Sequence, residues 1–277
     1  AGATGLSALA VSTWYFRQRS SPKNAAFVFV SPPANNANVR SLVAEAFSKH
    51  GVRIAKEGEI SSSAIKDRFL FDKHHIRFSS KAFLSTPSQF KLSEFESQRF
   101  NDVFRIAWDH ALAMNLVYNA AEACAELACT AEDLDRAWLE CKSSGEFVQF
   151  SDSFECGYVR VDGTDASLQR RPAGIFVING FFPRAREDFV GTSVGMHYYE
   201  VDLDGSNLSY SSFHEKIAGL GASQEASESS VQGRILKTWR ELGLKSEPKP
   251  SALCSTIHAS ASPVEALVNR MVWLGTR

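Results

Sequence analysis

The sequence is 277 residues long, with 44% hydrophobic residues, 22% charged residues and a formal net charge of −1 at pH 7. A chain of this size can bury a substantial core, as one large domain or two small ones. The near-neutral charge gives no indication of a nucleic-acid partner. The five cysteines form no CxxC pair and have no metal-finger spacing, so we expect reduced thiols in a cytosolic or organellar-matrix setting.

Residues 1–23 form an N-terminal extension that is apolar at first and then basic, with Arg17, Arg19 and Lys23. The apolar part is shorter than the roughly 20 residues that a membrane span needs. Three interpretations stay open: the remnant of an organelle-targeting region, a membrane anchor or interfacial helix, and a tail docked on a neighbouring surface. The second interpretation would bring residues 1–20 into contact with a membrane.

The first elements are expected to be a strand, a helix and a strand. The apolar run AAFVFVSP, at residues 25–32, predicts a buried strand. Apolar residues then recur at helical spacing from Val39 to Phe47, and Gly51 ends this helix. Residues 52–60 predict a half-buried strand.

The middle of the chain, residues 91–144, has the apolar period of helices. Its three apolar stripes begin at Phe100, Val117 and Leu134. Thr130 followed by Asp133 predicts a capping box at the start of the third helix. Residues 146–161 then predict a hairpin with its turn near residue 152, and residues 162–172 predict a polar loop.

The second half of the chain alternates again between strand and helix patterns. Residues 173–191 resume an apolar pattern that leads into a short helix. Residues 195–203 alternate in a way that predicts a strand with one buried face. Two more helices are predicted at residues 208–220 and 233–244, with a surface loop rich in Ser and Glu between them.

The last helix has the clearest start signal. Ser262 is the expected N-cap, Pro263 the first helical residue, and Glu265 the partner in a capping box. The apolar residues expected to form its buried stripe are Val264, Leu267, Val268 and Met271. His258 then lies just before a helix N-terminus, a position that favours anions.

The order of these elements, together with three stretches of sequence, resembles nucleoside diphosphate kinases. The stretches are FVFVSPPANNANVRSLVAEAFSKHGVRIAKEGEI, NGFFPRAREDFVGTSVGMHYYEV and IHASASPVEAL. The resemblance covers residues 24–80 and 173–277, and it implies an α+β fold with a four-stranded antiparallel ferredoxin-like sheet covered by helices. Residues 81–172 would then be a helical insertion with a hairpin, which the ordinary enzymes lack.

In that family, a histidine before the last helix accepts a phosphoryl group from a nucleoside triphosphate held with Mg²⁺ and passes it to a diphosphate. The resemblance assigns this role to His258. It places Lys216, Arg234, Ser260 and His75 in or near nucleotide-binding positions. Several of the family's other functional groups are replaced, and the residues found in their places are Ser31, Gln232, Ser255, Ala261 and Asn269.

The groups that would neutralise the transferred phosphate are therefore largely lost. Losing even one well-placed donor typically costs about 10²–10³ in rate. We therefore expect a catalytically degenerate, non-enzymatic member of the family, without a cofactor, that serves as a structural or accessory subunit of a larger assembly. The assembly would be photosynthetic or respiratory and associated with a plastid or mitochondrial membrane. Its protein subunits, rather than nucleic acid, would contact the N-terminal extension and the helical insertion.

Two alternatives stay open. One is an active or partly active nucleoside diphosphate kinase, using His258, Mg²⁺ and nucleotide. The other is a non-catalytic nucleotide sensor, and a cytoplasmic location also stays open. The adjacent His74 and His75 do not predict a metal site, because neighbouring residues on a strand point to opposite sides.

Overall fold

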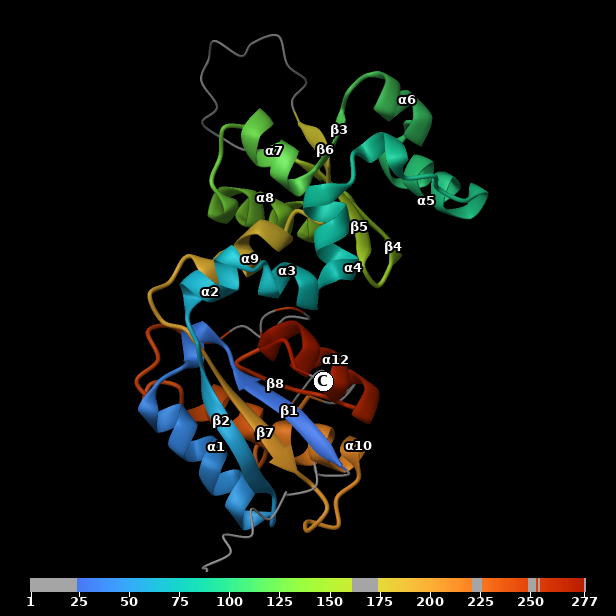
Figure 1. The fold of residues 1–277 in the computed structure, drawn as a ribbon. Helices are drawn as coiled ribbons and strands as arrows, with labels where there is room; N and C mark the ends of the chain where they lie inside the picture. The colour runs from blue at the N-terminus through green and yellow to red at the C-terminus, as the bar shows by residue number, and fades with distance from the viewer. Residues whose placement is uncertain (1–23, 161–173, 221–225, 249–252, 254, 277) are drawn as a thin grey trace, which may run out of the picture.

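The computed structural model describes residues 24–160, 174–220, 226–248, 253 and 255–276. Two four-stranded sheets are present, each with helices packed against it, so the mixed α+β class expected from the sequence is confirmed. Each sheet belongs to its own lobe, and helices join the two lobes (Figure 1). The first lobe holds both ends of the described chain, and the second lobe is built from its middle.

The first lobe contains a fully antiparallel sheet. Its strands are β1 (Ala25–Val30), β2 (Arg53–Ile60), β7 (Met196–Asp202) and β8 (Ile257–Ala259). Their order across the sheet is β2-β7-β1-β8, so β1 and β7 are central. The central strands are apolar runs buried on both faces, which requires helices on each side of the sheet.

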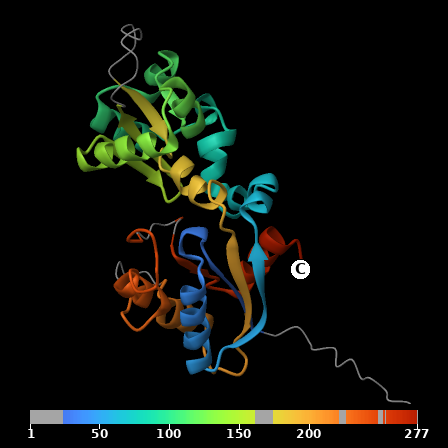
Figure 2. The same cartoon turned by 90° about the vertical axis from the view of Figure 1, so that its left-hand side faces the viewer.

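One face of this sheet is covered by helices from both halves of the chain. They are α1 (Ala37–Lys49), α10 (Tyr210–Ser212), the π-helical segment η5 (Phe213–Ala218) and α11 (Val231–Thr238). Phe47 and Phe213 pack here against Tyr199 of β7. A single 3-10 turn, η1 (Pro32–Ala34), joins β1 to α1. Figure 2 shows the lobe from the side.

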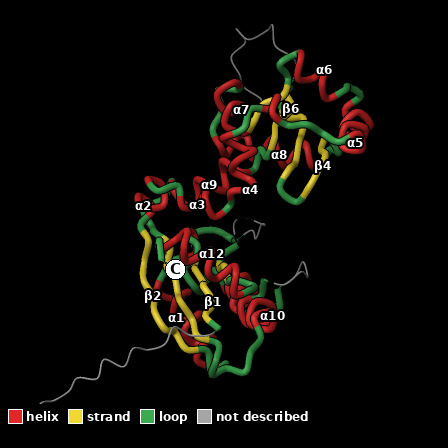
Figure 3. The backbone as a smooth tube through the Cα atoms, turned by 45° about the vertical axis from the view of Figure 1, so that its right-hand side comes forward, coloured by secondary structure: helices red, strands yellow, loops and turns green. Residues whose placement is uncertain are grey.

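The other face is covered by α12 (Pro263–Leu274). The helices that connect the lobes lie at the end of the sheet nearest the second lobe (Figure 1), and they are α2 (Ser62–Asp67), α3 (Leu70–His74), α4 (Ile76–Ser79), the π-helical segment η2 (Ser80–Leu84) and α9 (Phe182–Val190). Rings from four elements meet at this face: Phe29, Phe71, Phe189 and Trp273. Figure 3 shows α2, α3, α4 and α9 lying between the two sheets.

The second lobe contains a mixed sheet. Its strands are β3 (Val117–Asn119), β4 (Phe147–Ser151), β5 (Phe154–Val159) and β6 (Ile175–Ile178), in the order β3-β6-β5-β4. Only β3 and β6 are parallel. Helices α5 (Glu94–Phe104) and α6 (Trp108–Ala113) pack on one face, and α7 (Ala120–Glu126) and α8 (Ala131–Ser143) pack on the other. The 3-10 turn η3 (Pro87–Gln89) precedes α5.

Several local predictions in the second lobe are confirmed. Thr130 caps α8, and its hydroxyl accepts the amide of Asp133 at 3.1 Å while the carboxylate of Asp133 accepts the amide of Thr130 at 3.2 Å. The predicted apolar face of α8 is buried, including Trp138. The predicted hairpin is formed by β4 and β5, with its turn at residues 152–153. The four described cysteines are free thiols.

Two short strands of the second sheet were not predicted as such. Val117 starts strand β3 rather than a helical stripe, and Ile175 starts β6, which pairs with β3 and β5. The sheet of the second lobe therefore includes residues on both sides of position 173, and the middle region is not purely helical. Strand β3 has only three residues, which is too few to show the alternating pattern of a strand in the sequence. It is recognised as a strand only by its pairing with β6.

The exposure of two elements differs from the prediction. Strand β2 is an edge strand in which Ile60 is buried and most other side chains are exposed, instead of being half-buried. In α12 the predicted buried stripe is wrong: Val264 is 71% exposed, Val268 49%, Met271 45% and Leu267 39%. The buried residues of α12 are Ala266, Asn269 and Trp273. The helix is apolar on both sides, so its hydrophobic period could not identify the inner face.

Parts of the chain that carried predictions lie outside the described residues. These are the N-terminal extension at residues 1–23 and the predicted polar loop at residues 162–172. Of the helices in the described ranges, none combines the length and apolarity that crossing a membrane would require.

The inner face of α12 can be tested by mutation. Trp273→Ala is expected to lower the free energy of unfolding by about 3–5 kcal/mol, because it empties a large buried site beside Phe29. Leu267→Ser with Val268→Ser is expected to change it by less than about 1 kcal/mol, because both side chains are exposed. Urea unfolding measures both. A larger loss from the double serine variant than from Trp273→Ala would contradict this orientation of α12.

Candidate functional site at His258

Strand β8 places His258 between the sheet and α12. Ile257 and Ala259 point into the core on the α1 side, so His258 points to the opposite face. Its direct partner across the sheet is Phe29 of β1. The expected position just before the last helix is therefore observed, with Ser262 capping α12 by accepting the amide of Glu265 at 3.1 Å.

Aromatic rings and one amide surround the imidazole. The ring of His258 stacks on Phe29, with the centroids 4.7 Å apart and the planes at 20°, and the ring of His74 meets it edge-on at 4.9 Å. The side-chain amide of Asn269 donates to Nε2 of His258 at 3.0 Å. A nitrogen that accepts a hydrogen bond carries no proton, so this contact requires the neutral ring with its proton on Nδ1.

Two more histidines extend this cluster. The indole N–H of Trp273 donates to Nδ1 of His74 at 3.2 Å, and the rings of His74 and His75 lie 4.5 Å apart. His75 also contacts the ring of Phe71. His74 and His75 end α3 rather than lying on a strand, which is why adjacent residues here touch each other.

All three histidines are held neutral by their surroundings. Burial lowers the pKa of His74 to about 4, and the opposing contribution of Asn269 is smaller. Burial, followed by the neighbouring His74, lowers the pKa of His75 well below its ordinary value. The pKa of His258 is also far below its ordinary value, first through burial and then through His74, His75 and His214.

The cations expected near His258 are not gathered there. Arg234 lies on α11, on the far face of the sheet, where it pairs with Glu45 of α1 at 3.3 Å. Lys216 is exposed on η5, and no contact with His258 is found for it in the described part of the chain. The charged group next to Nε2 of His258 is instead a carboxylate, Glu265, at 3.6 Å.

Ser260 and His75 both make contacts inside the first lobe. Ser260 is fully buried, and its hydroxyl accepts the amide of Phe27 at 2.8 Å and donates to the carbonyl of the same residue at 3.2 Å. It therefore fastens the end of β8 to β1. His75 does lie in the cluster, as a neutral ring that contacts His74 rather than His258 directly.

The polar residues Ser31, Gln232 and Ser255, which the resemblance aligned with other functional positions, are hydrogen-bonded within the chain. Ser31 donates to the carbonyl of Thr256 at 3.3 Å, and the hydroxyl of Thr256 donates to Gln232 at 2.5 Å. Ser255 donates to the carbonyl of Ile257 at 2.7 Å. These short polar side chains bond to one another and to the backbone, and all are uncharged at neutral pH.

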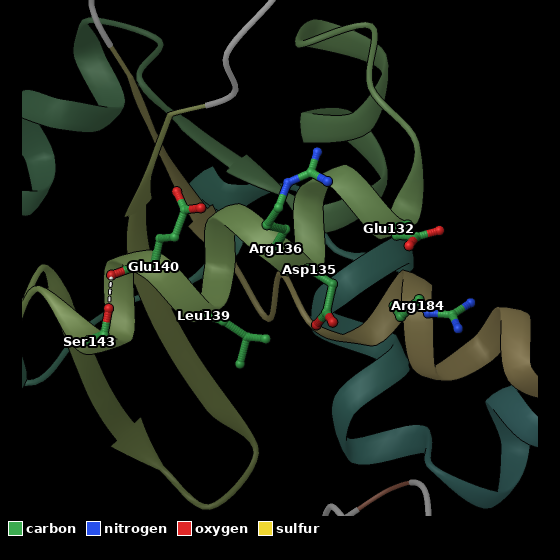
Figure 4. Close-up of a pocket in the computed structure, with 7 residues that line it drawn as sticks. All are labelled: Glu132, Asp135, Arg136, Leu139, Glu140, Ser143 and Arg184. Carbon is green, nitrogen blue, oxygen red and sulfur yellow. Dashed lines mark hydrogen bonds between the residues drawn. The ribbon is translucent and has the colours of Figure 1, made fainter. Parts of the chain in front are cut away.

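The residues around His258 do not fit Mg²⁺ with a nucleotide. A triphosphate needs cations around its oxygens, whereas the neighbours of His258 are the neutral imidazole ring of His74, the ring of Phe29, an amide and a carboxylate. No group of three or more metal-ligating side chains occurs in the described ranges. A surface cavity of about 420 Å³ lies elsewhere, against α8 and α9, with residues such as Glu132, Leu139 and Arg184 (Figure 4).

The cluster contains two residues that the sequence did not single out for the site. They are Trp273, which lies four residues after Asn269 on the same face of α12, and His74, which accepts the indole N–H of Trp273. The i, i+4 spacing of Asn269 and Trp273 was a usable signal, because two residues so spaced on a helix contact the same surface.

Comparisons with known proteins give no match: no family model, no curated protein and no solved structure is significantly similar to this chain.

The histidine cluster predicts acid sensitivity. Because the pKa values of the three histidines are depressed in the folded state, the unfolded chain binds more protons than the folded one below pH 6.5. Their contribution to the free energy of unfolding is therefore fully present above pH 6.5. It is lost as the pH falls towards about 4. Each histidine contributes at most about 1.4 kcal/mol per pH unit in this range. Urea unfolding between pH 7.5 and 4.5 measures the slope.

His75→Phe is expected to reduce this slope, since it removes one buried imidazole for which no hydrogen bond is found among the described residues. The matched control is His110→Asn, which removes an exposed histidine on α6. Equal slopes for the wild type and His75→Phe would show that His75 does not titrate as a buried group.

Proposed function

We propose that this protein is a catalytically inactive relative of nucleoside diphosphate kinases whose first lobe keeps the ferredoxin-like fold of that family. Two observations support the fold. In chain order, the four strands of the first sheet follow the pattern strand–helix–strand twice, and the order across the sheet puts the first and third strands at the centre. The histidine of the IHASAS stretch also lies at the end of the last strand, directly before the capped final helix.

The environment of His258 is the observation that carries the proposal of inactivity. Phosphoryl transfer depends on positioned cations that neutralise the developing charge. Around His258 the nearest partners are Phe29, His74 and Asn269, and Arg234 is held by Glu45 on the other side of the sheet. An incoming phosphate would meet the carboxylate of Glu265 instead of an arginine. The ring therefore acts as a structural link between β8 and α12.

A protein that retains this fold without the chemistry acts through its surfaces. The second lobe adds a complete sheet with four helices to the first. The outer side of α12 adds four exposed apolar side chains, and apolar patches of this kind mark interaction sites. We therefore assign the chain the role of a structural or accessory subunit of a larger assembly. The apolar and basic N-terminal extension supports a site at an organellar membrane, in a photosynthetic or respiratory complex.

One observation favours the alternative of a residual phosphoryl acceptor. The side chain of His258 keeps 21% of its surface exposed, so the ring is reachable from one side. A second kinase or a bound nucleotide would approach it there. The phosphoryl-transfer assay described next distinguishes this alternative from an inactive protein.

The proposal is tested by incubating the full chain with γ-labelled ATP and Mg²⁺, beside a His258→Asn variant. We expect no acid-labile phosphate above the level of the variant and no transfer to a nucleoside diphosphate, because the site lacks a cationic clamp. Circular dichroism establishes that both proteins are folded. If the wild type is labelled, the variant is not, and the label passes to a diphosphate, the proposal is wrong and the protein is an active kinase.

A further inference from the structure

The helices that join the two lobes present a row of basic and large apolar side chains to solvent. We call this row the waist patch, and it consists of Lys66, Arg68, Phe69, Lys73, Ile76 and Arg77. All six side chains are exposed. The patch runs from the end of α2 through α3 into α4, between the lobes (Figures 1 and 3).

These residues lie on three consecutive short elements. Phe69 is the residue before α3, Lys73 lies on α3, and Ile76 and Arg77 begin α4. The inner side of the same turns is buried in the core, with Phe71 fully enclosed. The solvent-exposed side of this segment therefore carries both cations and large apolar groups.

The waist patch is strongly positive within a chain of nearly neutral charge. Four exposed cations lie between residues 66 and 77, against one exposed carboxylate, Asp67. The other carboxylate, Asp72, is paired with Arg186 of α9 at 2.9 Å. Among the described residues, none of the four cations takes part in an ion pair, so their charge faces solvent.

The apolar members of the patch protrude. Phe69 is 57% exposed and Ile76 is 51% exposed. Phe69 also has a left-handed backbone, with φ of 54°, which is rare for a bulky residue and costs on the order of 1 kcal/mol. The left-handed conformation places Phe69 as the N-cap of α3, where its carbonyl accepts the amide of Lys73 at 2.9 Å, while its ring stays exposed to solvent.

We propose that the waist patch binds an anionic lipid surface, with its Lys and Arg side chains among the headgroups and Phe69 and Ile76 inserted at the edge of the acyl region. Cations flanking exposed apolar groups are the chemistry that anionic membranes select.

This inference deepens the proposed function and rests on it, because it assigns the membrane contact of the assembly to a definite surface. The contact lies along the membrane plane and requires no spanning helix. Each Lys or Arg near an anionic surface is worth about fivefold in affinity, equivalent to about 1 kcal/mol. Binding should also weaken as salt rises, because the Debye length is only about 10 Å at 0.1 M.

The test is co-sedimentation of the full chain with vesicles of phosphatidylcholine alone and with vesicles of phosphatidylcholine and phosphatidylglycerol. We expect binding to the anionic vesicles only. Lys73→Gln with Arg77→Gln should weaken it about 30-fold, from two factors of about five. Phe69→Asn with Ile76→Ser should weaken it further at high salt, since Asn tolerates the left-handed backbone.

Matched controls make the same chemical changes elsewhere. Lys49→Gln with Lys245→Gln removes two exposed cations outside the patch, and Phe95→Ser with Val103→Ser removes two exposed apolar groups on α5. Both controls should bind within about twofold of the wild type, with unchanged circular dichroism. If patch variants and controls bind equally, the contact lies elsewhere, as in residues 1–20. If the wild type does not bind anionic vesicles, the patch is not a lipid-binding surface, and an acidic protein is the next ligand to test. Either result overturns the proposal.

The vesicle result and the kinase result are independent. Phosphate transfer through His258 would overturn the inactive function and leave lipid binding in place. Absence of vesicle binding, with no transfer through His258, would leave an inactive subunit whose membrane contact is not the waist patch.

Discussion

The junction of β8, α12 and α3 is the contact on which the rest of this structure depends. Two hydrogen bonds define it, from Asn269 to His258 and from Trp273 to His74, and the ring of Phe29 lies beneath both histidines. Each donor meets an imidazole nitrogen that carries no proton, so both contacts favour neutral rings. It joins the edge of the first sheet to the helices that lead into the second lobe.

This arrangement gives His258 a structural role between β8 and α12. The side-chain amide of Asn269 donates to Nε2 of His258, and this favours the neutral form of the ring that packs against Phe29. The polar residues around it are bonded to the backbone or to one another, as Ser260 is to Phe27. His258 is therefore surrounded by packed rings and by polar side chains that already have partners.

Much of the first lobe could be predicted from the sequence, because its elements have strong local signals. The capped start of α12 and the apolar run of β1 are examples. The buried face of α12 could not be predicted, since valine and leucine on the outer side outweigh Asn269 on the inner side in any hydrophobic average. Strand β3 is defined by its pairing with β6, more than 50 residues away, which no local pattern contains. The position of His258 before the last helix could be predicted from the sequence. Its neutral neighbours could not, because they depend on the packing of α3 against α12.

The most direct measurement of the central claim is a nuclear magnetic resonance titration of the His258 imidazole, with ¹⁵N-labelled protein and with MgATP added at neutral pH. The account predicts a neutral ring protonated on Nδ1, a pKa well below the ordinary value, and no change in the ring signals with nucleotide. A ring that titrates near pH 6.5 and shifts when MgATP is added would contradict it, and would mean that His258 is an accessible group in a working nucleotide site.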